Sequence, residues 1–346
     1  MKAKKKPKFE SERVPLQDAI PLDTPLAIFV DPSSACNFRC SFCPTGHRDL
    51  IADTGRFQGA MAWDTFTKVV DDCKAFASPV KLLRLYKDGE PFLNKRLADM
   101  VAYAKRSGHI ERVDTITNGS LLTPERVKPV LDAGIDRISI SVDGMSREHY
   151  KQVTGYDLDF DEFVKNVRWL YANKGSCEIA VKIIDDIVTE EQRKQFYDIF
   201  EDHCDVISSE NLIPSWPEFD IEERSPFQMK GKETFHLPLK PKDVCTFIFY
   251  SIAVNADGKV SACLMDWTRK LSVGDVKTQS LKDIWHSQPM NDLRLQHLEG
   301  RARENPVCGQ CGELYYCQMD NIDTHREQLL PKFAEYARKT SVIPAE

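Results

Sequence analysis

The stretch LAIFVDPSSACNFRCSFCP, residues 26–44, joins a short apolar run to three closely spaced cysteines. Its first residues are rich in apolar and β-branched side chains and end before a proline, which predicts a buried strand. Cys36, Cys40 and Cys43 then fall in the loop that follows this strand. In parallel α/β sheets, the loops after the carboxyl ends of the strands build the active site. The stretch therefore predicts both the first strand of such a sheet and a site at its end.

Further along the chain, β-rich runs alternate with amphipathic helical stretches. We expect strands at 26–31, 81–86, 112–117, 137–142, 178–184 and 205–212. We expect helices at 63–76, 95–107, 124–133, 160–173 and 190–203. This alternation is typical of a parallel sheet covered by helices. The predicted fold class is therefore α/β, a partial (β/α)6 TIM-like barrel that spans residues 25–213.

The regions that flank this barrel have a different composition. Residues 1–24 begin with a lysine-rich run and predict a flexible basic leader. Residues 214–242 are rich in proline and charge, which predicts a linker or a lid.

Residues 243–346 predict a small second domain made of a β-hairpin and helices. Two apolar runs flank Asn255-Ala256-Asp257-Gly258, and Asp-Gly between such runs is a strong hairpin signal. Helices are expected near 281–298 and 324–338.

Composition and charge narrow the class of protein. A chain of 346 residues with 42% hydrophobic content can bury a large core, and a net charge of -6 does not favour nucleic acid as a partner. No run of about 18 apolar residues and no signal peptide occur, so we expect no membrane partner and a cytoplasmic location. Eleven cysteines, an odd number with short spacings, favour metal thiolates over disulfides.

Three thiolates as close as Cys36, Cys40 and Cys43 can hold three corners of a cubane iron–sulfur cluster and leave the fourth iron without a protein ligand. A structural zinc site normally has four protein ligands, and His47 is the one nearby candidate for a fourth. The residues alone leave both readings open. An open iron matters because a small chelating molecule can bind there and receive an electron through the cluster.

The segment CNFRCSFCP, residues 36–44, resembles the motif of the radical S-adenosylmethionine (SAM) superfamily, including Phe42 before the last cysteine. The resemblance implies that SAM chelates the open iron of a [4Fe-4S] cluster. It also implies that reductive cleavage of SAM gives methionine and a 5'-deoxyadenosyl radical. In that case the chain is an enzyme.

Segments after the later strands extend the resemblance. Asp88-Gly89-Glu90-Pro91 is similar to the family's GGEP motif, with Asp88 in place of the first glycine. Thr117-Asn118-Gly119 and the segment that ends at Asp143-Gly144 also lie where strands of the family meet SAM. The resemblance implies SAM contacts from Phe42, Asp88, Gly89, Glu90, Thr117, Asn118, Ser141 and Asp143.

A second group of cysteines lies in the C-terminal region: Cys245, Cys263, Cys308, Cys311 and Cys317. Four thiolates suit either a fully ligated cluster or a structural zinc ion. The region resembles the SPASM/twitch extension of radical SAM enzymes, and its spacing is similar to the single-cluster type of aminocyclitol dehydrogenases. The resemblance implies one auxiliary [4Fe-4S] cluster, with Cys317 as a free thiol, a redox neighbour or an alternative ligand. Cys73, Cys177 and Cys204 are interpreted as buried small hydrophobic residues.

An auxiliary cluster is a natural acceptor for the electron that a substrate radical must lose. We therefore expect oxidation of a sugar or aminocyclitol-type small molecule, with a flavodoxin- or ferredoxin-type protein as electron donor. Candidates for the general base that takes the hydroxyl proton are Lys87, Lys182, Asp185 and Glu210.

Three alternatives stay open. A peptide-modifying maturase is the first, although only about 25 residues precede the first strand, too few for a separate peptide-recognition domain. A radical epimerase is the second, with Cys204 or Cys317 as hydrogen donor. A non-catalytic metal-binding protein is the third.

Overall fold

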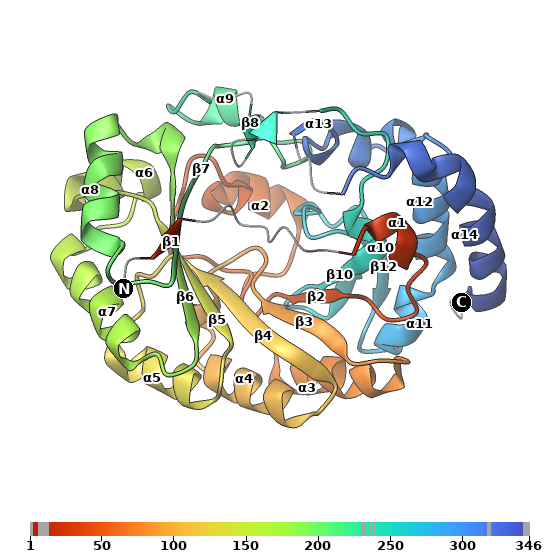
Figure 1. Cartoon of the computed structure of the whole chain (residues 1–346), viewed down its shortest axis with the longest axis horizontal. Helices are drawn as coiled ribbons and strands as arrows, with labels where there is room; N and C mark the ends of the chain where they lie inside the picture. The colour runs from red at the N-terminus through yellow and green to blue at the C-terminus, as the bar shows by residue number, and fades with distance from the viewer. Residues whose placement is uncertain are drawn as a thin grey trace.

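The computed structural model describes residues 3–5, 14–229, 233–234, 237–238, 240–316 and 320–341. Its centre is a run of parallel strands in the order β7-β6-β5-β4-β3-β2 (Figure 1). These are β2 (Ala27–Val30), β3 (Val80–Leu85), β4 (Ile110–Thr117), β5 (Arg137–Val142), β6 (Glu178–Ile184) and β7 (Val206–Glu210). The sheet is open rather than closed, so the predicted partial barrel is confirmed.

Five helices cover the outer face of these strands: α3 (Trp63–Asp72), α4 (Leu97–Arg106), α5 (Pro124–Asp132), α7 (Phe160–Asn173) and α8 (Glu190–Phe200). Local sequence sets their ends. Asp159 caps α7 through the Glu162 N–H, and Thr189 and Gln192 form a capping box on α8. Two shorter helices that were not predicted, α2 (Arg48–Thr54) and α6 (Arg147–Thr154), lie in the loops after β2 and β5.

The C-terminal region continues the barrel sheet. Strand β10 (Ser251–Val254) pairs in parallel with β2, and β11 (Lys259–Ser261) and β12 (Ser272–Asp275) follow antiparallel. The predicted hairpin is therefore present as β10–β11. The start of the apolar run, however, is helix α10 (Phe247–Tyr250), and β12 was not predicted. A short apolar run does not by itself distinguish a strand from a buried helical turn.

Helices close the C-terminal region on the side away from the barrel (Figure 1). The single helix expected near 281–298 is divided into α11 (Leu281–Trp285) and α12 (Gln288–Leu298), because Ser287 caps α12 and Pro289 fits only its first turn. The last helices are α13 (Glu313–Tyr316) and α14 (Arg326–Thr340).

The expectation of a flexible leader at 1–24 is wrong for the part that the structure describes. Strand β1 (Lys4–Lys5) pairs with β7, and helix α1 (Leu16–Ala19) buries Leu16. Ile20 is fully buried, and its carbonyl accepts a hydrogen bond from Lys332 Nζ at 2.7 Å. A few apolar side chains between polar ones were enough to anchor this segment on the C-terminal helices.

The segment between the two domains holds α9 (Ile221–Arg224) and a short pair, β8 (Glu233–Thr234) with β9 (Leu237–Pro238). Phe219 and Ile221 are buried. Among the described residues, no helix is both long and apolar enough to cross a membrane.

Candidate functional site

The three-cysteine loop is a tight turn between β2 and α2. The Cys43 N–H donates to the Cys40 carbonyl at 3.2 Å, and the Gly46 N–H donates to the Cys43 carbonyl at 2.9 Å. A Cβ at Gly46 would lie 2.3 Å from the Cys40 carbonyl oxygen, so this turn requires glycine. The three thiols are electrostatic neighbours, and burial raises the pKa of Cys36 to about 12. Protons would therefore leave these thiols on metal binding.

His47 is already engaged elsewhere. Its Nε2 atom lies 2.9 Å from the Ser41 carbonyl oxygen, and its ring packs against Phe219 with centroids 5.2 Å apart. The arrangement favours ligation by the three cysteines alone.

The loop after β3 lies directly on the cysteine loop. A Cβ at Gly89 would lie 2.2 Å from the carbonyl oxygens of Ser33 and Ala35, and the Glu90 N–H donates to Ala35 at 3.0 Å. No other residue type fits at Gly89 without moving one of the two loops. We call residues 88–91 the SAM loop, after the role that the resemblance gives them.

Glu90 joins the SAM loop to the end of β4. Its carboxylate accepts from the Phe92 N–H at 3.0 Å, the Thr117 hydroxyl at 2.7 Å and the Asn118 N–H at 2.8 Å. Burial raises the pKa of Glu90 to about 7. The Asn118 side chain in turn reaches Asn37 at 3.0 Å and the Cys36 thiol at 3.9 Å. The predicted SAM residues of β3 and β4 are thus brought together beside Cys36.

Strands β5 and β6 add a second polar group near the same cysteines. Asp143 is buried, burial raises its pKa to about 6, and its charge acts on the Cys40 thiol. Ser141 lies opposite Lys182 in the β5–β6 register. Phe42 is half-buried against the main core.

The side chains of the four candidate general bases do not all lie together. Lys182 and Glu210, on β6 and β7, form an ion pair at 2.9 Å. Asp185 follows β6 and lies 3.8 Å from Arg193. Lys87 is buried, and its Nζ donates to Asp88 at 3.1 Å and to the Asp266 carbonyl at 3.3 Å. Of the four, Lys182 is the one whose charge acts on Asp143, where it lowers the pKa of that carboxyl.

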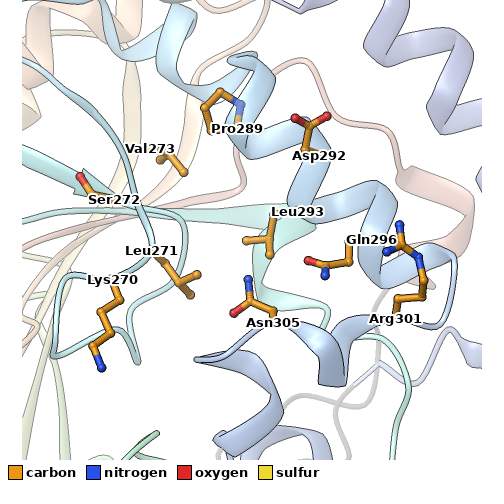
Figure 2. Close-up of a pocket in the computed structure, with 10 residues that line it drawn as sticks. All are labelled: Lys270, Leu271, Ser272, Val273, Pro289, Asp292, Leu293, Gln296, Arg301 and Asn305. Carbon is orange, nitrogen blue, oxygen red and sulfur yellow. The ribbon is translucent and has the colours of Figure 1, made fainter.

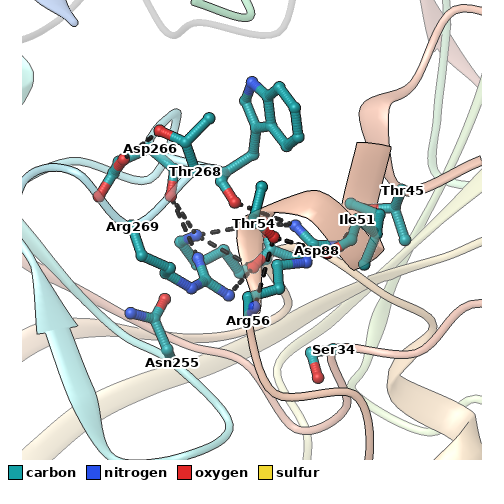
Figure 3. Close-up of polar contacts among 12 residues, drawn as sticks. Ser34, Thr45, Ile51, Thr54, Arg56, Asp88, Asn255, Asp266, Thr268 and Arg269 are labelled. Atoms are coloured by element: carbon teal, nitrogen blue, oxygen red, sulfur yellow. Dashed lines mark hydrogen bonds and ion pairs between the residues drawn. The ribbon is translucent and has the colours of Figure 1, made fainter. Parts of the chain in front are cut away.

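The Asp88 side chain does not point toward a ligand. It forms ion pairs with Arg56, Lys87 and Arg269, and none of the four side chains is more than 11% exposed. Figure 3 shows Arg56 and Arg269 beside Asp88. Burial opposes its charge, but the three cations hold the pKa of Asp88 well below its usual range. The ion pairs engage the Asp88 carboxylate, so the SAM contact that the resemblance implies for Asp88 would come from its backbone.

Asp31 lies beside this group and was not predicted as a site residue. It is fully buried, and neither carboxylate oxygen has a hydrogen-bond partner in the described part of the chain. Burial and repulsion by Asp88 raise the pKa of Asp31 to about 7, against the attraction of the nearby cations. Its position after β2 was the available signal, but nothing in the sequence showed that it would lack partners.

This buried carboxyl predicts a pH dependence of stability. In the unfolded chain Asp31 ionises near pH 4, so the folded state holds an extra proton between about pH 4 and 7. Stability is therefore lost as pH rises through that window. Asp31→Asn is expected to raise Tm at pH 8, by an effect on the order of 2 kcal/mol, and by less at pH 5.5. Thermal unfolding of the reconstituted protein at both pH values measures this, and an equal gain at both would contradict the assignment.

Four C-terminal cysteines surround one cavity. Cys245, Cys263, Cys308 and Cys311 line a small cavity of about 20 Å³ together with apolar side chains such as Ile248 and Leu314. The backbone holds this arrangement, since the Cys245 N–H donates to His297 Nδ1 at 3.1 Å and the Met265 N–H to the Cys263 thiol at 3.4 Å.

These four thiols fit a fully ligated cluster. No group of three or more His, Cys, Asp or Glu side chains among the described residues lies close enough to hold a single metal ion. A cubane cluster binds each thiolate to a different iron, so it suits cysteines that surround a cavity. Cys317 lies outside the described residues.

Three further cysteines and a surface pocket of the C-terminal region lie away from the site. Cys73, Cys177 and Cys204 are buried as expected. The pocket, of about 400 Å³, lies between the β12 region and α12 and is lined by residues such as Lys270, Asp292 and Arg301 (Figure 2). It contains none of the predicted site residues.

Comparisons with known proteins agree with this geometry. The sequence model of the radical SAM superfamily matches residues 30–202, and that of SPASM, an iron–sulfur cluster-binding domain, matches residues 245–326. The chain is 27% identical over 301 residues to the tungsten-containing aldehyde ferredoxin oxidoreductase cofactor-modifying protein of Pyrococcus furiosus, which covers 75% of this chain and 81% of that protein. It is 35% identical over 127 residues to a GTP 3',8-cyclase of Stenotrophomonas maltophilia, 36% of each chain.

Solved structures share the fold at low identity. BtrN in complex with AdoMet and 2-DOIA has a TM-score of 0.55 at 18% identity, over 86% of this chain and 96% of that chain. The protein anSMEcpe with bound AdoMet has a TM-score of 0.58 at 14% identity, over 90% and 99%. Streptococcus suis SuiB bound to the precursor peptide SuiA has a TM-score of 0.57 at 14% identity, over 86% and 72%.

Proposed function

Because the chain belongs to the radical SAM superfamily and carries a SPASM domain, we propose that it dehydrogenates a sugar or an aminocyclitol-type small molecule. Its cofactors are SAM, the [4Fe-4S] cluster that binds SAM, and an auxiliary [4Fe-4S] cluster. When bound, SAM and its cluster supply a hydrogen-abstracting radical. Cys36, Cys40 and Cys43 would hold that cluster, and the four cysteines around the cavity would hold the other.

The observation that carries the proposal is a contact between the SAM loop region and the cavity that the C-terminal cysteines line. The Lys87 side chain, next to the SAM loop, donates to the Asp266 carbonyl, and Asp266 lines the cysteine cavity. An electron acceptor in that cavity would thus lie beside the SAM loop. Oxidation of an alcohol to a ketone removes a hydrogen atom from carbon, a proton from the hydroxyl and one further electron. An acceptor next to the reacting substrate serves the last of these steps.

Lys182 and Glu210 are the pair that we assign to the proton. Burial opposes the charge of Lys182, but Glu210 raises its pKa, so the lysine stays protonated and the carboxylate stays available. Lys182 would hold the hydroxyl oxygen of the substrate, and Glu210 would accept its proton. A flavodoxin- or ferredoxin-type protein would supply the electron that starts each turnover.

A small substrate is supported by the similarity to BtrN, which covers nearly all of that chain and was solved with 2-DOIA. A peptide substrate is the second candidate. SuiB was solved with its precursor peptide, and an open groove of about 970 Å³ runs along the segment between the domains, lined by Trp216, Phe219 and Tyr315 among others.

The epimerase alternative loses one of its two hydrogen donors. The Cys204 thiol donates to the Phe200 carbonyl at 3.2 Å and lies beside Ala3 and Tyr171 at the β1–β7 edge of the sheet. This edge is remote in the sheet order from β2 and β3, whose loops carry the cluster cysteines and the SAM loop.

The test separates the auxiliary cysteines from SAM cleavage. Cys263→Ser with Cys308→Ser is expected to lose about four irons per chain and to keep reductive SAM cleavage. With a panel of sugars and aminocyclitols, wild type should form one ketone per 5'-deoxyadenosine, and the variant should form 5'-deoxyadenosine with little ketone. Ketone formation by the variant, or modification of peptides in place of polyols, would count against the proposal. Cys73→Ser is the matched control, since it alters a buried cysteine outside both groups.

A further inference from the structure

Three segments far apart in the sequence meet at Asp88. Arg56 follows the cysteine loop, Asp88 begins the SAM loop directly after Lys87, and Arg269 lies in the loop after Cys263. We call residues 263–271 the auxiliary loop. The Arg269 guanidinium donates to the Asp88 carboxylate, Lys87 lies 3.1 Å from it, and Arg56 lies 3.7 Å from it. Figure 3 shows Arg56 and Arg269 approaching Asp88 from two different segments of the chain.

The meeting point excludes water. The side chains of Asp88 and Lys87 are each 1% exposed, that of Arg56 is fully buried, and that of Arg269 is 11% exposed. A buried charge that loses its partner is strongly unfavourable, so each of these ion pairs constrains the segments that carry it.

Arg56 extends the contact to the first cysteine loop. Its guanidinium donates to the Thr45 hydroxyl at 2.8 Å, two residues after Cys43, and to the Trp267 carbonyl at 3.3 Å. Asp88 therefore connects both cysteine loops through side chains that touch each of them.

The auxiliary loop is built to present Arg269. The Asp266 carboxylate accepts from the Lys270 and Leu271 N–H groups at 3.0 Å and from the Ser261 hydroxyl at 2.9 Å. Arg269 itself has φ +66°, a left-handed conformation that is unfavourable for a non-glycine residue. The surrounding hydrogen bonds hold the loop in this conformation, with the guanidinium directed at Asp88.

We propose that Asp88 and Arg269 form an ionic latch, a pair of positioning residues that fix the auxiliary loop against the SAM loop and so set the geometry in which SAM binds. Asp88 precedes Gly89, whose backbone already touches Ser33 and Ala35. A shift of Asp88 is therefore transmitted to the SAM loop. The inference goes beyond the proposed function, because it holds for any substrate.

Charge guides the choice of variants. Without Arg269, Asp88 still has two cationic partners, Lys87 and Arg56. Arg269→Met should therefore still fold. Without Asp88, the cations Arg56, Lys87 and Arg269 lose the carboxylate that they share, and Arg269→Met in that background removes one of these three charges.

The experiment is a double-mutant cycle on SAM affinity with the reconstituted protein. Asp88→Asn and Arg269→Met are each expected to weaken SAM binding about 10-fold, and the double variant to be no weaker than Asp88→Asn alone. Iron content and the EPR change on SAM addition are recorded beside the affinity. Arg269→Lys should recover most of the affinity, and Lys270→Met, the neighbouring exposed lysine paired with Glu218, should match wild type.

Wild-type SAM affinity in Arg269→Met overturns the latch, and so do losses that multiply in the double variant. If Arg269→Met loses iron, Arg269→Gln, which removes the charge and keeps a polar side chain, decides: weaker SAM binding at full iron content supports the latch, and wild-type binding refutes it. None of these measurements needs the substrate, so a failure of the latch proposal can be distinguished from a failure of the dehydrogenase proposal.

Discussion

Replacement of Cys36, Cys40 and Cys43 together by alanine is expected to remove about four irons per chain and to abolish reductive SAM cleavage. The physical reason is that the variant removes all three thiols of this loop, and the ring nitrogen of the nearby His47 already lies at hydrogen-bond distance from the Ser41 carbonyl oxygen. The measurement is iron and sulfide content after anaerobic reconstitution, with 5'-deoxyadenosine quantified after reduction by dithionite.

The same variant should keep the auxiliary iron, because Cys245, Cys263, Cys308 and Cys311 lie around their own cavity. Cys177→Ala, which alters a buried scaffold cysteine, is the matched control and should resemble wild type in both assays. Cleavage that survives in the triple variant would contradict the assignment of this loop as the SAM-binding cluster site.

Gly89→Ala is expected to lower SAM affinity by about 100-fold or more and to destabilise the protein by about 3 kcal/mol. The added Cβ would stand 2.2 Å from two backbone carbonyl oxygens, and backbone cannot move aside as a flexible side chain can. The SAM loop and the cysteine loop must therefore separate. Isothermal titration with SAM and thermal unfolding measure the two effects.

The matched control is Gly175→Ala, where the new Cβ meets nothing within 4 Å. That position has φ +57°, so the control is expected to cost about 1 kcal/mol of stability and no SAM affinity. Equal SAM binding by Gly89→Ala and wild type would show that the loop contact is not needed for the cofactor.

Much of the fold could be predicted because its signals are local. The strands β5 and β6 match their expected bounds, since alternating or continuous apolar runs between turns define such strands. The positions of the cysteine loop and the SAM loop could also be predicted, because each comes directly after a strand of this kind, β2 or β3. Parallel strands place their carboxyl ends together, so the sequence order of motifs already implied one site.

Other features depend on partners that the sequence does not reveal. The leader was misread because the anchoring of Ile20 and Leu22 depends on Lys332 and Tyr336, far along the chain. The sequence predicted a SAM contact at Asp88, but nothing in it indicated that the Asp88 carboxylate would pair with Arg269, 181 positions away. A single residue that departs from a motif, such as Asp88 in place of glycine, shows where this chain differs from the family. It does not show which residue will contact the new side chain.

The central claim is that SAM binds to the cluster held by Cys36, Cys40 and Cys43 in a chain that holds a second cluster. The most direct measurement is EPR of the dithionite-reduced, reconstituted wild type before and after addition of SAM. The account predicts signals from two clusters, of which one changes on SAM addition and is missing in the triple alanine variant. A spectrum that SAM does not alter, or a SAM-dependent change that persists in the triple variant, would contradict it.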